Sequence, residues 1–300
     1  MGVYLSKANT TKDTTEGENN RLKFTSCSMQ GWRINMEDAH IADIEQGEIG
    51  EIKDIFGVFD GHGGQEVAKF CAKHFAKTLR NNEAFKAGDY AKALEQTFLK
   101  MDELILAEEG QEELKRMKMD SESGISFAGC TANVVLVTPT HIYCANAGDS
   151  RAVMLWENGE FLALSKDHKP DGEIERARIE AAGGYINNGR VNDNLNLTRA
   201  IGDFEYKRGS SISAEKQIIT AFPDVSVTKL EKKPKLLVLG CDGIWETVPD
   251  PKICETLQKK IDAGTPITTA AEELLDSLVA KDTSEGVGCD NMTCVVVQFK

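Results

Sequence analysis

The sequence predicts an α+β fold, an antiparallel β-sandwich of two sheets flanked by pairs of antiparallel helices in a four-layer αββα arrangement. From Cys130 to Leu164, short apolar runs are joined by tight turns with no helix between them. Such spacing favours antiparallel strands, because parallel strands need long crossovers. Helical periodicity appears in two separate groups, before and after this region. Helices that are distributed in this way are expected to cover the outer faces of the sheets.

The first third of the chain contains the first strands and two long helices. Residues 1–20 are polar without periodicity and predict a flexible arm. Strands are expected from Leu22 to a turn at 30–32 and over 39–44 and 54–59. Apolar residues at helical spacing then predict helices over 65–80 and 89–119, the second interrupted near Gly110.

The remainder of the chain adds shorter elements. A helix is expected over 173–182 and a hairpin at 187–189, and the polar stretch 192–221 predicts an irregular surface flap. Prolines open two more helices, from Asp250 to Ile261 and from Pro266 to about Lys281, and the chain closes with a strand over 292–299. Because no repeat and no linker rich in Pro, Gly or Ser interrupts the sequence, residues 21–300 are expected to form a single domain.

Composition restricts the partners and the compartment. A formal net charge of -13 argues against binding to nucleic acid, since phosphate polymers attract basic surfaces. The eight cysteines form no Cys-x-x-Cys pair, which indicates a reducing compartment and no zinc site. No apolar run approaches the length of a membrane span. We therefore expect a cytoplasmic monomer.

The N-terminus carries one targeting signal. The start Met1-Gly-Val-Tyr-Leu-Ser6 fits the pattern for myristoylation of Gly2 after removal of the methionine. The acidic residues nearby offset the lysines, so no polybasic second anchor accompanies the acyl chain, and a single myristoyl chain binds membranes only marginally. Weak, reversible membrane association is the most that this signal implies.

Three apolar runs end in an aspartate beside a glycine, at Asp60, Asp149 and Asp242. The segment Phe56-Gly-Val-Phe-Asp-Gly-His-Gly-Gly64 adds an imidazole, His62, to the first of these. By itself a strand-end Asp-Gly is a turn or a cap. If the three positions converge, strands deliver metal-binding and proton-transfer groups to one edge of the fold.

Further acidic side chains extend this pattern. Glu37 and Asp38 follow Arg33 in one short segment, and Asp290 comes just before the final strand. Hard oxygen ligands in this number, in a chain with five histidines, suit Mg²⁺ or Mn²⁺ better than Zn²⁺. Two such ions sharing Asp60 would hold a bridging water and lower its pKa, which makes that water a nucleophile near neutral pH.

Seven segments in order resemble the signature motifs of the metal-dependent type 2C (PPM family) protein serine/threonine phosphatases. Together they cover the chain from about Arg21 to its end, and they are 29–40, 58–64, 146–152, 167–170, 197–203, 239–245 and 289–293. The resemblance implies hydrolysis of phosphoserine and phosphothreonine in proteins by attack of a water that bridges two Mg²⁺ or Mn²⁺ ions.

The resemblance also assigns a role to each residue. Asp60 would bridge both ions, Asp242 and Asp290 would complete the shell of one ion, and Glu37 with the Gly61 carbonyl would serve the other. Asp149, with Asp242, resembles a ligand of a weaker third ion. Asp38 would orient a metal-bound water. Arg33 would bind the substrate phosphate through two parallel hydrogen bonds, and His62 would protonate the leaving alkoxide as general acid.

One other class of function stays open at this point, a non-catalytic binding protein that keeps the fold and an acidic ion site without turnover. The intact set of Arg33, Glu37, Asp60, His62, Asp242 and Asp290 argues against it. A calcium-binding module is rejected, because no single stretch supplies the spaced acids and glycine. Asp203, in the stretch Ile201-Gly-Asp-Phe204, superficially resembles the kinase Asp-Phe-Gly motif. No nucleotide-binding glycine loop accompanies it, and we interpret Asp203 as a structural turn.

Overall fold

The computed structural model describes residues 4–47, 52–118, 127–208 and 211–300. Gly2, the expected acylation site, lies outside the described residues. Within the described residues, no helix combines the length and the apolar character that crossing a membrane requires.

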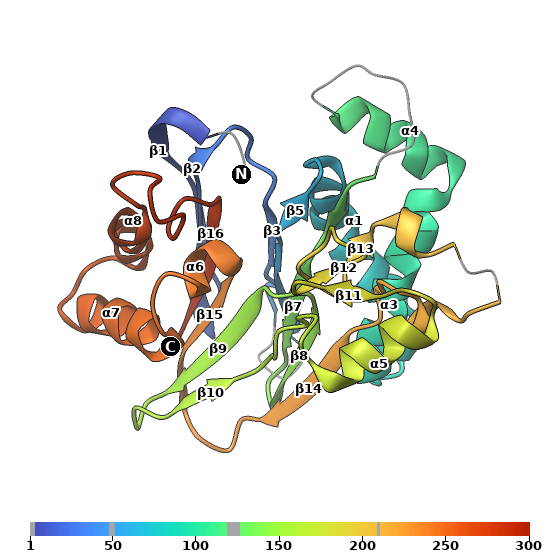
Figure 1. Cartoon of the computed structure of the whole chain (residues 1–300). Helices are drawn as coiled ribbons and strands as arrows, with labels where there is room; N and C mark the ends of the chain where they lie inside the picture. Colours follow the sequence, from blue (N-terminus) through green and yellow to red (C-terminus); the bar gives the residue numbers. More distant parts are fainter. Residues whose placement is uncertain (1–3, 48–51, 119–126, 209–210) are drawn as a thin grey trace.

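Two large antiparallel sheets form the centre of the structure (Figure 1). The first sheet has six strands, in the spatial order β1 (Tyr4–Glu18), β2 (Leu22–Arg33), β16 (Met292–Phe299), β15 (Pro234–Gly240), β9 (Arg151–Trp156) and β10 (Phe161–Ala163). The second has five, in the order β14 (Asp224–Lys229), β8 (His141–Ala147), β7 (Ala132–Val137), β4 (Asp54–Phe59) and β3 (Ala39–Asp43). The predicted antiparallel pairing is confirmed in both sheets.

Helices cover the outer face of each sheet (Figure 1). The first sheet is covered by α7 (Asp250–Asp262) and α8 (Ile267–Leu278), and the second by α1 (Glu66–Asn81) and α3 (Tyr90–Leu106). The shorter helices are α2 (Glu83–Lys86), α4 (Glu108–Met117), α5 (Glu173–Ala181) and α6 (Asp242–Trp245). The four-layer αββα prediction is therefore confirmed.

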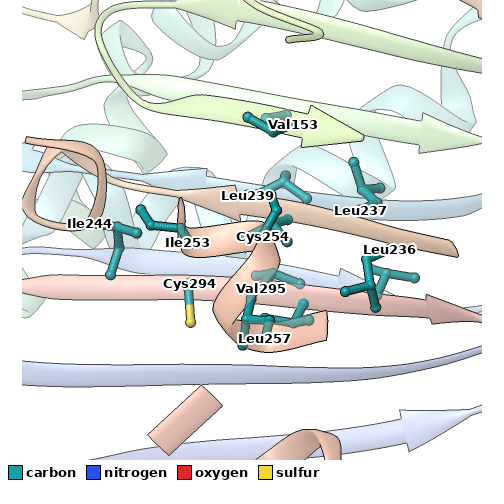
Figure 2. Packing of buried hydrophobic residues seen from close by; sticks show 14 of the residues in the cluster. Val153, Leu236, Leu237, Leu239, Ile244, Ile253, Cys254, Leu257, Cys294 and Val295 are labelled. Atoms are coloured by element: carbon teal, nitrogen blue, oxygen red, sulfur yellow. The ribbon is translucent and has the colours of Figure 1, made fainter. Parts of the chain in front are cut away.

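Strand β15, in the middle of the first sheet, is apolar on both sides because both of its sides are covered. Leu236 to Leu239 of β15 are fully buried without alternation, as expected for a strand packed between two layers. Figure 2 shows Ile253, Cys254 and Leu257 of α7 in the same cluster as this strand. All eight cysteines are free and buried and behave as small core residues.

The prediction of a flexible arm over residues 1–20 is wrong for the described part. Residues Tyr4–Glu18 form β1, which pairs antiparallel with β2 at the edge of the first sheet. Its inward side chains are polar and meet α8, where the Thr14 hydroxyl donates to Glu272 at 3.1 Å and Lys12 pairs with Asp276. Polar contacts hold this strand in place, whereas the prediction recognised strands by alternating apolar residues, which are absent here. Similarly, β2 continues through the expected turn to Arg33, with Gly31 in the left-handed region at φ 66°.

The expected surface flap over 192–221 is also corrected, since parts of it are buried. It contributes β13 (Ile201–Gly202) and the 3-10 turns η1 (Phe204–Tyr206) and η2 (Ala214–Lys216). Leu197, Ala200 and Ile219 pack with Ile179 of α5 in a small core of their own. Before it lies the predicted hairpin, β11 (Ile186–Asn187) and β12 (Arg190–Val191). The segment is mainly polar in sequence because only a few of its residues belong to this small core.

Candidate active site

A cavity of about 430 Å³ is lined by residues that follow strands of both large sheets. Asp60 lies between β4 and β5 (Gly61–His62), Asp149 follows β8, Asp242 begins α6 directly after β15, and Asp290 precedes β16. The structure brings eight of the predicted site residues together in its wall: Arg33, Glu37, Asp60, Gly61, His62, Asp149, Asp242 and Asp290. Asp38 does not line the cavity and is only 6% exposed.

The backbone around Asp60 is held by close packing. The Asp60 amide donates to the Thr131 hydroxyl at 3.2 Å, and the Thr131 amide donates to the Asp60 carbonyl at 2.9 Å. A Cβ atom at Gly61 would lie 2.3 Å from the Glu37 carbonyl oxygen. Only glycine therefore lets the two segments that carry Asp60 and Glu37 come this close.

Asn291 is a positioning residue that the sequence analysis did not single out. Its side-chain amide donates to the carbonyls of Gln30 and Asn35 at 2.8 and 2.9 Å, and its oxygen accepts from the Glu37 amide at 2.9 Å. Three hydrogen bonds from one buried side chain thus fix the loop that carries Glu37 beside Asp290. A signal was present, since Asn291 lies within the quoted motif 289–293.

The carboxylates repel one another in this site. Burial raises the pKa of Asp60 well above its usual value, and the charges of Asp242 and Asp38 raise that pKa further. The pKa of Asp242 is likewise raised well above its usual value by burial and then by Asp149 and Asp290. Burial raises the pKa of Asp38 to about 6. Bound cations would offset both the burial and the repulsion of these carboxylates, because a cation favours the ionised form of every carboxylate near it.

The donor atoms fit hard divalent cations. Ligand atoms of Asp38, Asp60 and Cys241 lie within 4.8 Å of one another, and the buried Oδ2 of Asp38 has no hydrogen-bond partner. Burial raises the pKa of the Cys241 thiol well above its usual value, so the sulfur stays protonated. It accepts from the Thr293 amide at 3.2 Å and donates to the Asn291 carbonyl at 3.5 Å. Cys241 is therefore a packing residue, and the carboxylate oxygens are the atoms that would hold a hard cation.

Two basic side chains form ion pairs with carboxylates that were predicted to bind metal. Arg33 forms an ion pair with Asp290, and its side chain is 47% exposed. Lys169 pairs with Asp149, and its ammonium also lies 3.7 Å from Glu246. These pairs place positive charge beside Asp290 and Asp149.

His62 contacts Asp203, which was predicted only as a structural turn. Its Nε2 lies 2.7 Å from Oδ2 of Asp203, whose side chain is 2% exposed. Burial lowers the pKa of His62, but the charge and hydrogen bond of Asp203, together with the charges of Asp149 and Glu37, outweigh this effect and the net shift is upward. Asp203 does occupy a turn, with φ of 50°, but its carboxylate contacts the predicted acid. Only the pairing of distant segments revealed this contact.

Residues 22–287 match the family model described as protein phosphatase 2C. The chain belongs to the protein phosphatase 2C family. Probable protein phosphatase 2C 6 of Paramecium tetraurelia is 47% identical over 300 residues, which cover 100% of both chains. Probable protein phosphatase 2C 21 of Arabidopsis thaliana is 40% identical over 334 residues, which cover 100% of this chain and 93% of the relative.

Solved structures agree with this membership. A phosphatase from Toxoplasma gondii matches with a TM-score of 0.74 and 25% identity, and the match covers 96% of each chain. A serine-threonine phosphatase 2C from the same organism, at 20% identity and a TM-score of 0.76, shares the fold. As a protein phosphatase 2C, the chain is a hydrolase of phosphoserine and phosphothreonine in phosphoproteins, and its family depends on Mg²⁺ or Mn²⁺.

Proposed function

We propose that this protein phosphatase 2C hydrolyses phosphoserine and phosphothreonine by direct attack of a water held between two Mg²⁺ or Mn²⁺ ions, without a phosphoenzyme intermediate. The convergence of Glu37, Asp60, Asp242 and Asp290 on one cavity supports this proposal. Asp60 would bridge the two ions, Asp242 and Asp290 would hold one, and Glu37 with the Gly61 carbonyl the other. Asp149 would serve a weaker third ion together with Asp242.

Bound at these residues, the two ions would supply positive charge to the phosphoryl group and would lower the pKa of the attacking water. Side chains of the protein would orient the water and bind the phosphate. Asp38, buried behind the cavity with one free carboxylate oxygen, would orient the water. Arg33, half exposed at the cavity, would bind two phosphate oxygens through its planar guanidinium, which a lysine does not reproduce.

His62 is the proposed general acid. An alkoxide is a poor leaving group unless it is protonated as it departs, and general acids contribute roughly 10²- to 10⁴-fold to such steps. The ring lines the cavity and is 26% exposed, so a substrate oxygen has access to it. We further propose that the protein is a cytoplasmic monomer and that myristoylation of Gly2 adds weak, reversible membrane contact.

The decisive experiment is release of inorganic phosphate from a phosphothreonine peptide after the metal has been stripped from the protein. We expect activity to return with Mg²⁺ or Mn²⁺ and to be absent in Asp60→Asn with either ion. Asp276→Asn is the matched control, because Asp276 lies on α8, pairs with Lys12 and is 56% exposed. Metal-dependent stabilisation without turnover in the wild-type protein would instead favour a non-catalytic ion-binding protein.

A further inference from the structure

The buried Asp203 and the partly exposed imidazole of His62 form a pair at the wall of the cavity. The Asp203 Oδ2 lies 2.7 Å from His62 Nε2, and the two residues are 141 positions apart in the chain. His62 lines the cavity, whereas Asp203 does not and is 2% exposed. Since Nε2 faces Asp203, Nδ1 is the ring nitrogen left to face a substrate oxygen.

A small three-stranded sheet brings Asp203 and His62 together. Its central strand, β6 (Gly129–Cys130), pairs with β5 through His62 and Gly129 and with β13 through Gly202 and Gly129. Asp203 directly follows Gly202, so the two side chains meet across the Gly129 backbone. A Cβ atom at Gly129 would lie 2.4 Å from Asp203 Oδ2 and 2.7 Å from His62 Nε2. The contact therefore requires glycine at position 129.

The backbone of Asp203 is fixed in an uncommon conformation. Its φ is 50°, in the left-handed region that Asp and Asn tolerate better than other side chains. Its amide donates to the Ala128 carbonyl at 3.2 Å, and its carbonyl accepts from the Tyr206 amide at 3.0 Å. These bonds hold the carboxylate toward His62.

Helix α3 anchors the segment from the other side. Asp102 of α3 accepts from the Gly202 amide at 2.8 Å and from the Lys207 ammonium at 2.6 Å. Lys207 also donates to the Ala200 carbonyl at 2.8 Å. The residues on both sides of Asp203 are thus tied to a rigid helix, and Asp203 is held in place before any substrate binds.

We propose that Asp203 is a positioning residue that orients the His62 ring toward the leaving oxygen of the substrate, an inference that rests on the proposed acid role of His62. As the P–O bond breaks, its electron pair remains on the Ser or Thr oxygen and the proton passes to that oxygen from His62. Asp203 receives no proton and does not touch the substrate. A buried aspartate that holds an imidazole in one orientation performs the same task in serine proteases, where replacement by asparagine costs about 10⁴-fold in kcat.

The test compares Asp203→Asn, His62→Gln and the double variant on two substrates at saturating Mn²⁺. Asparagine keeps the shape of the side chain and tolerates the left-handed backbone. We expect Asp203→Asn to lower kcat on a phosphothreonine peptide by about tenfold or more, with KM unchanged. On an aryl phosphate, whose leaving group needs no proton, the loss should be less than about threefold. The double variant should be no slower than His62→Gln alone, because both changes remove one function.

The matched control is Asp224→Asn, since Asp224 Oδ2 lies 3.1 Å from His168 Nε2 and neither residue lines the cavity. It should show no difference between the two substrates. If Asp203→Asn is poorly folded, Asp203→Gly serves instead, because glycine adopts positive φ readily.

Two outcomes would overturn the inference, and they can be told apart. If His62→Gln is selective for the peptide while the Asp203 variants slow both substrates equally, or their losses multiply in the double variant, Asp203 is structural only. If His62→Gln itself shows no selectivity, the acid role of His62 fails, and the role of Asp203 fails with it.

Discussion

At the scale of single residues, the acidic cavity is partly neutralised by basic side chains of the chain itself. Arg33 pairs with Asp290 and Lys169 pairs with Asp149, and both acids are proposed metal ligands. An ion that uses either carboxylate must compete with these cations. The competition matters most for Asp149, because the third ion is the one that the sequence analysis expects to bind weakly.

We therefore expect Lys169→Met to strengthen binding of the weakest Mn²⁺ ion. Removing the ammonium frees Asp149 and reduces repulsion of the incoming cation, and a gain of about 1.4 kcal/mol corresponds to tenfold in affinity. Counting of bound Mn²⁺ by electron paramagnetic resonance during a titration measures this directly. Lys235→Met is the control, since Lys235 pairs with Asp262 away from the cavity. Unchanged affinity in Lys169→Met would mean that Lys169 does not compete for the site.

At the scale of elements, β1 completes the first sheet and covers an edge that would otherwise be open. It pairs with β2 from Tyr4 to Glu18, with irregularities on either side of Asn9, and contacts α8 through polar side chains. An uncovered β2 edge would present unpaired backbone groups to other chains.

Deletion of residues 1–18 should therefore destabilise the protein and promote association. For a domain of 150–250 residues, each kcal/mol lost lowers Tm by about 2–4 °C, so a loss of several kcal/mol is readily seen. Thermal unfolding and light scattering measure the two effects. Lys7→Ala, at an exposed position of the same strand, is the control and should change neither. A deletion variant as stable as the full chain would restore the flexible-arm interpretation.

The segment 192–221 is held to α5 by a buried ionic network. Glu175 accepts from Arg199 at 2.7 Å and pairs with Arg178 at 2.8 Å, and its side chain is 7% exposed. Burial opposes ionisation of Glu175, but the two arginines and Thr198 lower its pKa to about 2. Because this pKa is lower in the folded state, the stabilisation is complete above pH 4.5 and is lost as pH falls toward 2.

Glu175→Gln should consequently lower stability at pH 7 by on the order of 3 kcal/mol, since it leaves the buried Arg178 without its carboxylate partner and Arg199 with Asp224 alone. It should also reduce the loss of stability that the wild-type protein shows between pH 5 and pH 3. Urea unfolding at three pH values tests both statements. Glu180→Gln, whose partner Arg176 is at the surface of the same helix, should behave as wild type. An unchanged pH profile in Glu175→Gln would rule out this network as the source of acid sensitivity.

At the scale of the whole molecule, the candidate metal centre joins the two sheets. Asp60 follows a strand of the second sheet, while Asp242 and Asp290 adjoin strands of the first. Ions that bind all three connect both halves of the sandwich, and a ligand that binds only the folded state stabilises it globally.

Removal of divalent ions should lower the stability of the entire domain. Mn²⁺ at 100 times its Kd adds about 2.7 kcal/mol through linkage. Unfolding followed by far-ultraviolet circular dichroism with Mn²⁺ and with a chelator should show one transition that moves as a whole. In Asp60→Asn the shift with Mn²⁺ should be small, whereas Asp276→Asn should keep it. A shift of equal size in Asp60→Asn would exclude Asp60 as the bridging ligand.

Local sequence patterns predicted the layers, the main strands and eight residues of the candidate site. Continuous apolar runs and helical periodicity reflect burial against neighbouring layers, so the strand ending at Phe59 and the helix from Glu66 were predicted to within a residue or two. Eight residues of the cavity were named in advance, because each of these lies in a segment that resembles a motif of the family.

Three features became visible only in the folded structure: the strand β1, the buried parts of 192–221 and the partner of His62. Polar side chains carry no apolar period, so β1 became a strand through pairing with β2 and contact with α8. Asp203 meets His62, which is 141 residues away in the chain, because the short strands β5 and β13 both pair with β6. Local sequence encodes burial and turns, whereas contacts between distant polar groups depend on how the chain closes in space.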